Sequence, residues 1–196
     1  MLKNSNTKVM SNNIRINWEI IDFLNDKDSL IYSFFQQTEP LRQKYLLSVI
    51  NSFEETDHYW TNQFQDNYVS DCFQGTTGYS VVSNSFSPTY SLNLDTITPD
   101  SILIQTSCWI KGSDSELKFV ISVESEKSLL VYHAIDLNKQ IIENTSWNHV
   151  YNYLYYDNSA DLKSAIMKVY IWNAGKNNIL IDDFNVNLSI EPHDVY

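Results

Sequence analysis

The chain has 196 residues and a pI near 4.6, with 13 basic and 24 acidic side chains and a formal net charge of −11 at pH 7. Aromatic residues make up 14% and charged residues 19%, a composition too rich in rings and too poor in charge for a disordered chain. The sequence has no basic stripe, which argues against nucleic acid and anionic membrane surfaces as partners. No run approaches the roughly 20 apolar residues of a membrane helix, so direct membrane insertion is not expected.

Two cysteines, Cys72 and Cys108, permit one disulfide but do not require it. Residues 1–13 are polar and contain no apolar segment of the kind found in a secretory signal. We therefore expect a cytoplasmic protein if the chain is complete. If it is part of a larger protein, we expect one of the cell envelope or the extracellular space.

The N-terminal quarter is the hardest part to interpret. Residues 1–13 are predicted to form a disordered tail, and residues 14–50 an N-terminal extension of uncertain structure. Within it, apolar residues at every second position from Ile14 to Ile20 predict a strand. The segment from Pro40 to Ile50 fits a helix that Pro40 opens, but its alternating apolar residues fit a strand nearly as well.

From residue 51 onward, short apolar runs separated by polar turns predict an all-β domain with little helix. We expect strands over residues 78–82, 101–111, 116–124, 129–135, 150–156, 166–172 and 179–190. Several strands at this spacing indicate a jelly-roll-like antiparallel β-sandwich. The sandwich is predicted to cover residues 51–190, followed by a C-terminal tail over residues 191–196.

The sequence lacks the motifs of known catalytic sites. None of its four histidines lies in a nucleophile-elbow, metalloprotease or phosphate-loop context, and four glycines provide no Gly-rich nucleotide loop. The carboxylate pairs Glu54-Glu55 and Asp182-Asp183 are adjacent in sequence. Neighbouring strand residues point to opposite faces, so neither pair forms an acid/base couple by itself. We do not expect an enzyme.

Aromatic residues alternate along several predicted strands and suggest a ligand platform. If the aliphatic positions face the core, a set of aromatic side chains lies on an outer sheet face. This candidate ligand-binding set is Trp109, Tyr132, Tyr151, Tyr153, Tyr155, Tyr170 and Trp172. Aromatic rings flanked by amide groups suit the mixed apolar and hydroxyl-bearing surface of a sugar. The alternative is that residues 14–50 or a protein partner cover this face.

Two further side chains follow from the same alternation. Asn152 should point inward, because it shares parity with the aliphatic positions of its strand. Trp147, at the start of that strand, is expected to fill space between the sheets.

Six short motifs, in order along the chain, carry a family resemblance. They are Phe53-Glu54-Glu55, Gly78-Tyr79-Ser80, Trp109-Ile110-Lys111, Trp147-Asn148-His149-Val150, Val169-Tyr170-Ile171-Trp172-Asn173 and Ile181-Asp182-Asp183-Phe184. In order and separation they resemble the carbohydrate-binding-module-like jelly rolls of the galactose-binding-domain type. The last two strands look like those of domains appended to bacterial envelope proteins. The resemblance covers about residues 51–190.

The resemblance implies a non-catalytic binding or accessory module, with carbohydrate as the expected ligand class. The alternative is a structural protein–protein interaction domain of a larger envelope assembly. The resemblance also implies a structural calcium ion bound by Glu54 and Asp182, or by Glu55 and Asp183 if the register is off by one. Hard oxygen donors are the ligands that calcium requires.

Overall fold

The computed structural model describes residues 45–94, 101–126, 128–157 and 165–189. The chain divides into two compact units, residues 1–44 and 45–196, and the description below concerns the second. The predicted tails at residues 1–13 and 191–196 and the strand at 14–20 lie outside the described residues. Within those residues no helix is both long and apolar enough to cross a membrane.

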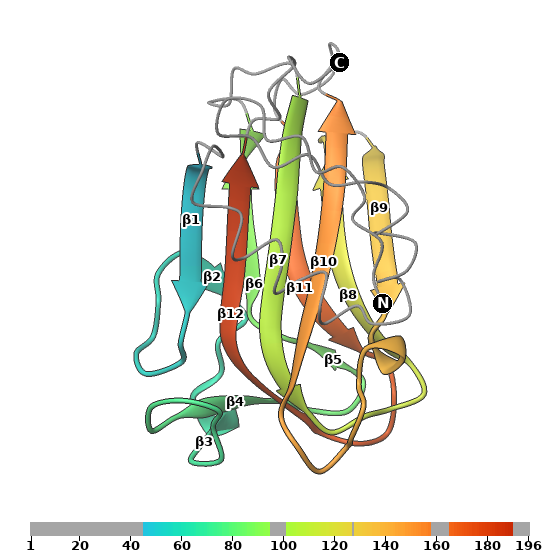
Figure 1. The fold of residues 1–196 in the computed structure, drawn as a ribbon. Helices are drawn as coiled ribbons and strands as arrows, with labels where there is room; N and C mark the ends of the chain where they lie inside the picture. The colour runs from blue at the N-terminus through green and yellow to red at the C-terminus, as the bar shows by residue number, and fades with distance from the viewer. Residues whose placement is uncertain (1–44, 95–100, 127, 158–164, 190–196) are drawn as a thin grey trace, which may run out of the picture. The chain divides into compact units, whose positions relative to one another are not determined.

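The first sheet is antiparallel and has the neighbour order β10-β7-β12-β4-β3, with β1 also paired to β12 (Figure 1). Its strands are β1 (Tyr45–Asn51), β3 (Tyr68–Val69), β4 (Gly78–Val81), β7 (Ser101–Lys111), β10 (Asn148–Asp157) and β12 (Ile179–Ser189). On the side of β12 opposite β7, its first half pairs with β4 and its second half with β1. One long strand thus joins two short ones into a single sheet.

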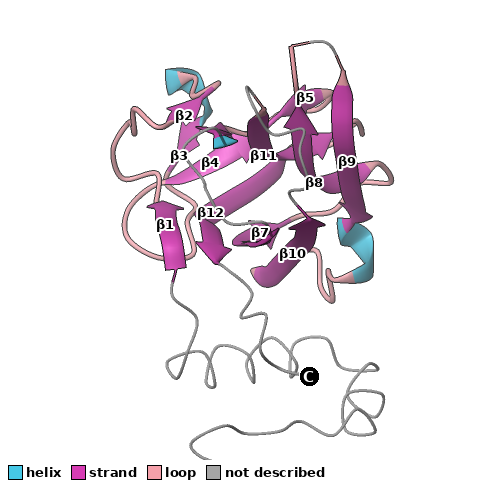
Figure 2. Ribbon diagram, turned by 90° about the horizontal axis from the view of Figure 1, so that it is seen from above, coloured by secondary structure: helices cyan, strands magenta, loops and turns pink. Residues whose placement is uncertain are grey.

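The second sheet is also antiparallel and has the order β2-β6-β11-β8-β9, with β5 paired to β11. Its strands are β2 (Trp60–Thr61), β5 (Ser85–Phe86), β6 (Thr89–Asn93), β8 (Leu117–Glu124), β9 (Leu129–Asp136) and β11 (Ile166–Asn173). Two single-turn 3₁₀ helices, η2 (Gln65–Asn67) and η4 (Leu137–Lys139), lie in connections. Viewed from above, the strands form two layers, which confirms the predicted β-sandwich (Figure 2).

Alternation along each strand places apolar side chains between the layers. On β11, Met167, Val169 and Ile171 are fully buried, while the residues between them are partly exposed. Phe184 packs against Phe119 of the facing sheet at a ring-centroid distance of 5.3 Å. Full burial of such a side chain contributes roughly 1.5–3 kcal/mol, so this layer supplies the main stabilisation of the unit.

Buried asparagines tie the layers together through hydrogen bonds. Asn152 is 2% exposed and donates from Nδ2 to the carbonyl of Phe119 across the sandwich at 3.1 Å. Asn173 is fully buried and donates to the carbonyls of Val81, Val82 and Asn177. The inward orientation expected for Asn152 is confirmed, and its amide is satisfied by a backbone partner.

The seven predicted strands are present with boundaries shifted by at most a few residues. The predicted start of the sandwich needs correction, because β1 pairs with β12 from Tyr45 onward and belongs to the sandwich. The open choice for residues 45–50 is thereby resolved as strand. The sequence missed β6 and the short strands β2, β3 and β5. Cys72 and Cys108 are both free thiols.

Candidate functional site

Three tyrosines on β10 project from the outer surface of the first sheet. Tyr153 is 63% exposed and Tyr155 is 47% exposed, whereas Tyr151 is half-buried. Along β10 the residues between them, Asn152 and Leu154, point toward the other layer. We call the outer surface formed by β10, β7, β12 and β1 the tyrosine face.

Polar side chains of β7 and β12 form the floor beside these rings. The strand register places Gln105 directly opposite Tyr153 on one side and Asn187 on the other. In the next row, Ser107 lies between Tyr151 and Asn185. An amide-rich strip therefore runs alongside the line of tyrosines.

Several of these floor groups have no hydrogen-bond partner within the described part of the chain. Side chains at every second position of β7 and β12, in step with Gln105 and Asn187, point to this outer face. The unpartnered atoms at such positions are Ser101 Oγ, Gln105 Oε1, Asn185 Oδ1 and Ser189 Oγ. All four are shielded from solvent in the structure. A buried polar atom without a partner costs free energy, and such atoms usually mark a place for water or a ligand. Ser101 and Ser189 are almost fully buried, whereas Gln105 and Asn185 are partly exposed, so these two amides make this face the candidate site.

An aromatic cluster closes one end of the tyrosine face. Phe73 stacks on Trp109, with ring centroids 3.7 Å apart and an interplanar angle of 12°. Trp109 also contacts His149 at 4.8 Å, and Trp147 meets the edge of Phe73 at 6.3 Å. Burial in this cluster lowers the pKa of His149 to about 4, because desolvation disfavours the charged imidazolium.

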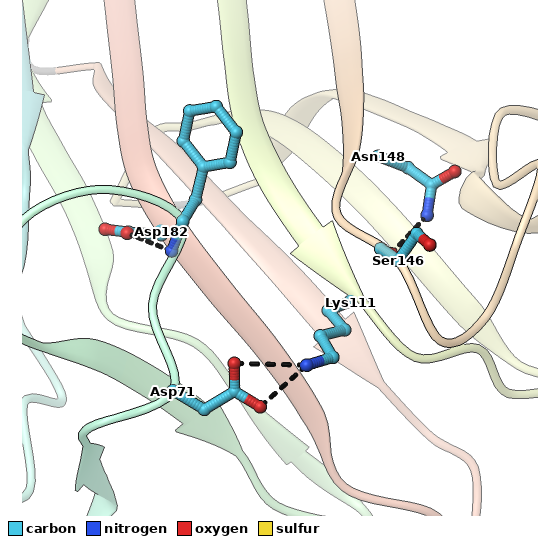
Figure 3. A network of polar contacts seen from close by, with 6 residues as sticks. Asp71, Lys111, Ser146, Asn148 and Asp182 are labelled. Carbon is cyan, nitrogen blue, oxygen red and sulfur yellow. Dashed lines mark hydrogen bonds and ion pairs between the residues drawn. The ribbon is translucent and has the colours of Figure 1, made fainter.

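The loop that carries Phe73 is fixed to the sheet by acidic side chains. Asp182, fully buried, accepts hydrogen bonds from the backbone N–H groups of Phe73 and Gln74 at 2.8 and 3.0 Å. At the start of the loop Asp71 forms an ion pair with Lys111 at 2.8 Å (Figure 3). Burial raises the pKa of Asp182, and its three backbone N–H donors lower it in part.

Glu54 holds the far side of the same loop. Its carboxylate accepts hydrogen bonds from the Thr76 hydroxyl and from the backbone N–H groups of Thr76 and Thr77. These hydrogen bonds, the Thr76 hydroxyl first, lower the pKa of Glu54. Gly75 has a φ of +76°, a backbone conformation that favours glycine, and a Cβ there would also displace the Glu54 carboxylate from the loop N–H groups.

These contacts bear on the expected calcium ion. Glu54 and Asp182 each direct their oxygens at backbone N–H groups of the loop. Within the described residues, no group of three or more His, Cys, Asp or Glu side chains is arranged to hold a metal. Calcium requires six to eight oxygen ligands, so this donor set fits loop anchoring and does not by itself form a calcium site. The calcium ion stays a prediction for a melting experiment.

The structure divides the predicted ligand-binding set between two surfaces. Tyr151, Tyr153 and Tyr155 lie on the tyrosine face, as their alternation predicts. Tyr132, Tyr170 and Trp172 lie on β9 and β11, in the second sheet, so one continuous platform of all seven residues is ruled out. The sequence shows which side chains share a strand face, but not which strands share a sheet.

The structure also corrects the roles expected for two tryptophans. Trp109 belongs to the tyrosine face, but Phe73 covers its ring, so Phe73 presents the exposed aromatic surface there. Trp147, expected between the sheets, packs beside Phe73 instead. Sequence reasoning missed Phe73, Gln105 and Asn185. Gln105 could have been found, since it shares parity with Trp109 on a strand whose boundaries were predicted correctly.

Comparisons with known proteins support the fold. No protein-family model and no curated protein sequence matches the chain. Among solved structures, the xylan-binding domain CBM22-1 of Paenibacillus barcinonensis Xyn10C superposes with a TM-score of 0.51 at 19% identity, covering 76% of this chain and 97% of that domain. The tandem CBM22-1–CBM22-2 structure of the same protein gives 0.51 at 17% identity, covering 78% and 47%. The chain therefore shares the β-sandwich fold of these two structures, the fold that its strand pattern predicted.

Proposed function

We propose that this chain is a non-catalytic module that binds carbohydrate on the tyrosine face. The observation that carries the proposal is the pairing of Tyr153, an exposed ring, with Gln105, whose Oε1 atom has no partner in the described residues. A sugar offers an apolar C–H face for the ring and hydroxyl groups that can bind the partly exposed Gln105 amide.

The spacing of the rings favours an extended chain of sugar units. Tyr153 and Tyr155 are two residues apart on one strand, which separates them by about 7 Å along β10. The unpartnered Gln105 oxygen lies on β7, next to β10, and the unpartnered Asn185 oxygen lies one strand further away, on β12. A glycan lying along β10 would contact both rings and donate hydroxyl hydrogens to the floor.

Charge favours a neutral glycan. Two rows of paired residues cross β10, β7, β12 and β1, one through Gln105 and one through Ser107. They contain tyrosine, amide, hydroxyl and aliphatic side chains, and no charged residue. The full chain carries a net charge of −11, which repels polyanions such as acidic polysaccharides. Xylan, which is named for the solved domain of similar fold, is a suitable first probe.

Titration calorimetry with soluble xylan and other neutral polysaccharides tests the proposal. We expect Tyr153→Ala to weaken binding about tenfold, the effect of losing about 1.4 kcal/mol of stacking and contact energy. Tyr59→Ala is the matched control, because Tyr59 is 72% exposed but belongs to the loop before β2. Equal affinities of Tyr153→Ala and the unchanged chain would place the binding site elsewhere.

A second candidate function is that of a protein–protein interaction domain. Exposed Leu46 and Ile50 on β1, at 39% and 52%, provide apolar contact area at the opposite edge of the tyrosine face. A protein partner would cover these side chains together with the tyrosines. A correctly folded protein that binds no polysaccharide in the panel would favour this function.

A further inference from the structure

One edge of the first sheet is a long, regular strand. β10 pairs with β7 over its full length without a register shift, and in the described part of the chain no strand pairs with its outer side. The other edges differ. The edge strands β1 and β9 each have a register shift in their pairing, and β2 and β3 are two residues long. Bulges and short strands protect a sheet edge against pairing with another chain, and β10 has neither protection.

A side chain covers one position of the β10 edge. Gln140 accepts from the backbone N–H of Tyr151 at 2.8 Å and donates to its carbonyl at 2.9 Å, as a neighbouring strand would. Backbone groups of alternate strand residues point to the same side, so those of Tyr153 and Tyr155 also point away from β7. Among the described residues these groups meet no partner strand. The edge is therefore open from Tyr153 onward.

The open edge lies in a neutral segment of an acidic chain. From Asn148 to Tyr156 the only ionisable group that could be cationic is His149, and burial lowers its pKa to about 4, so it is neutral at pH 7. Two copies of a chain with a net charge of −11 repel each other. A neutral strand edge is the place where that repulsion opposes close approach least.

β9, the edge strand of the second sheet, lies on the same side of the sandwich as β10 (Figure 1). Val131 stands opposite the fully buried Val123 and shares its inward face, and Ile135 stands in the same way opposite Phe119. Both β9 side chains are only half-buried, because no strand continues the sheet beyond them. Leu129 on the same strand is 57% exposed. This side of the sandwich thus has apolar surface that a neighbouring molecule would cover.

We propose that β10 is an interaction surface for a second copy of this chain, paired antiparallel and centred on Tyr155. In this register Tyr155 lies opposite its own counterpart, and Leu154 lies opposite Tyr156 of the second copy. Tyr153 lies opposite Asp157, so the pairing gives about six backbone hydrogen bonds. A register shifted by one residue would place Tyr151 in the pairing, where Gln140 already occupies the edge.

The second copy fits this edge better than an isolated extended peptide does. Antiparallel pairing of two identical strands has a two-fold axis perpendicular to the sheet, so the interface closes on itself. This axis leaves the second sheets of both copies on the same side of the joined sheet. The two β9 strands therefore face each other and cover the apolar surface beside β10. A peptide on the β10 edge would leave that surface open.

Pairing along β10 would also join the two tyrosine faces. The two six-stranded first sheets become one continuous sheet, with Tyr153 and Tyr155 of both copies near its centre. Strand pairing lies in the plane of the sheet and leaves these rings on its outer surface. A polysaccharide could then contact both copies, which raises avidity. This consequence alone rests on the proposed function.

Sedimentation velocity of the full chain without sugar, over a wide range of protein concentration, tests the pairing. We expect a dimer that dissociates on dilution. Tyr155→Lys sets two like charges directly opposite each other and should raise the dimer Kd at least about tenfold. Tyr155→Pro removes the outward N–H at the centre and should act in the same direction. The matched control is Tyr151→Lys, on the same strand face but at the position that Gln140 covers, and it should leave the Kd unchanged. Urea unfolding verifies that each variant is folded.

Amide hydrogen exchange identifies the surface that pairs. The Tyr155 amide should exchange more slowly at high protein concentration than at low. A chain that stays monomeric at every concentration overturns the proposal, and so does a dimer that Tyr155→Lys and Tyr151→Lys weaken equally. Slow exchange of the Tyr155 amide in a monomer also overturns it, because another part of the chain would then cover the edge. A β10 dimer that binds no polysaccharide supports this inference and contradicts the proposed function.

Discussion

Acidification should destabilise the aromatic end of the tyrosine face through His149. Burial beside Trp109 lowers the His149 pKa from 6.5 to about 4 in the folded protein. The folded state therefore favours the neutral imidazole, while in the unfolded chain His149 takes up a proton with its unperturbed pKa of 6.5. The stabilisation is fully present above pH 6.5 and is lost as the pH falls from 6.5 toward 4.

The size of the effect follows from linkage. At about pH 5, His149 would be almost fully protonated in the unfolded chain and mostly neutral in the folded one, a difference of about 2 kcal/mol relative to about pH 8. Because His149 is not fully buried, water and counter-ions reduce this value, and we expect about 1–2 kcal/mol.

Urea unfolding followed by tryptophan fluorescence at both pH values measures this quantity. His149→Gln should reduce the loss of unfolding free energy on acidification by about 1–2 kcal/mol. The matched control, His58→Gln, removes an exposed histidine and should leave the loss as it is in the unchanged chain. The carboxylates titrate in all three proteins and cancel in the comparison. If His149→Gln keeps the full pH dependence, burial of this imidazole does not govern acid stability.

Two further predictions concern the loop that carries Phe73. Asp182→Ala should lower the free energy of unfolding by about 1–3 kcal/mol, because it leaves the Phe73 and Gln74 N–H groups without an acceptor. Asp71→Ala, which removes an exposed ion pair, should cost less than about 1 kcal/mol in the same urea titration. If calcium binds at Glu54 and Asp182, the melting temperature should be higher in calcium than in chelator, and Glu54→Gln should abolish the difference. Equal melting temperatures would contradict the calcium prediction.

Most long strands could be predicted from the sequence, because burial of one face imposes a two-residue period. In Leu117–Glu124 the side chains of Leu117, Phe119, Ile121 and Val123 are all fully buried, as their alternation indicates. β6 is harder to recognise, because Thr89–Asn93 is short and begins after Pro88. Its pairing with β11 depends on residues more than seventy positions away. Local patterns do not contain that information.

The tyrosine face was predictable strand by strand but not as a surface. Parity fixes that Tyr153 and Trp172 each point outward from their strands. It does not reveal that β10 and β11 belong to different sheets. Two consecutive strands show the same alternation whether they pair as a hairpin in one sheet or lie in the two opposite sheets. Phe73 was missed for a similar reason. It lies in a loop whose backbone N–H groups donate to Asp182, a contact distant in sequence that helps to hold the loop over Trp109.

A bulge in β12 connects the fold to the tyrosine face. Asp183 has a φ of +46°, and the pairing of β12 with β7 shifts between Asp182 and Asn185. A bulge adds a residue and re-aims the side chains around it. Here Ile181 and Phe184 both reach the core, while Asp182 reaches the loop N–H groups. Without this extra residue, a strict two-residue period that keeps Ile181 in the core would turn Phe184 out of the core and Asn185 away from the outer face. The irregularity is therefore what allows one strand to complete the core, anchor the Phe73 loop and supply an unpartnered amide to the candidate site.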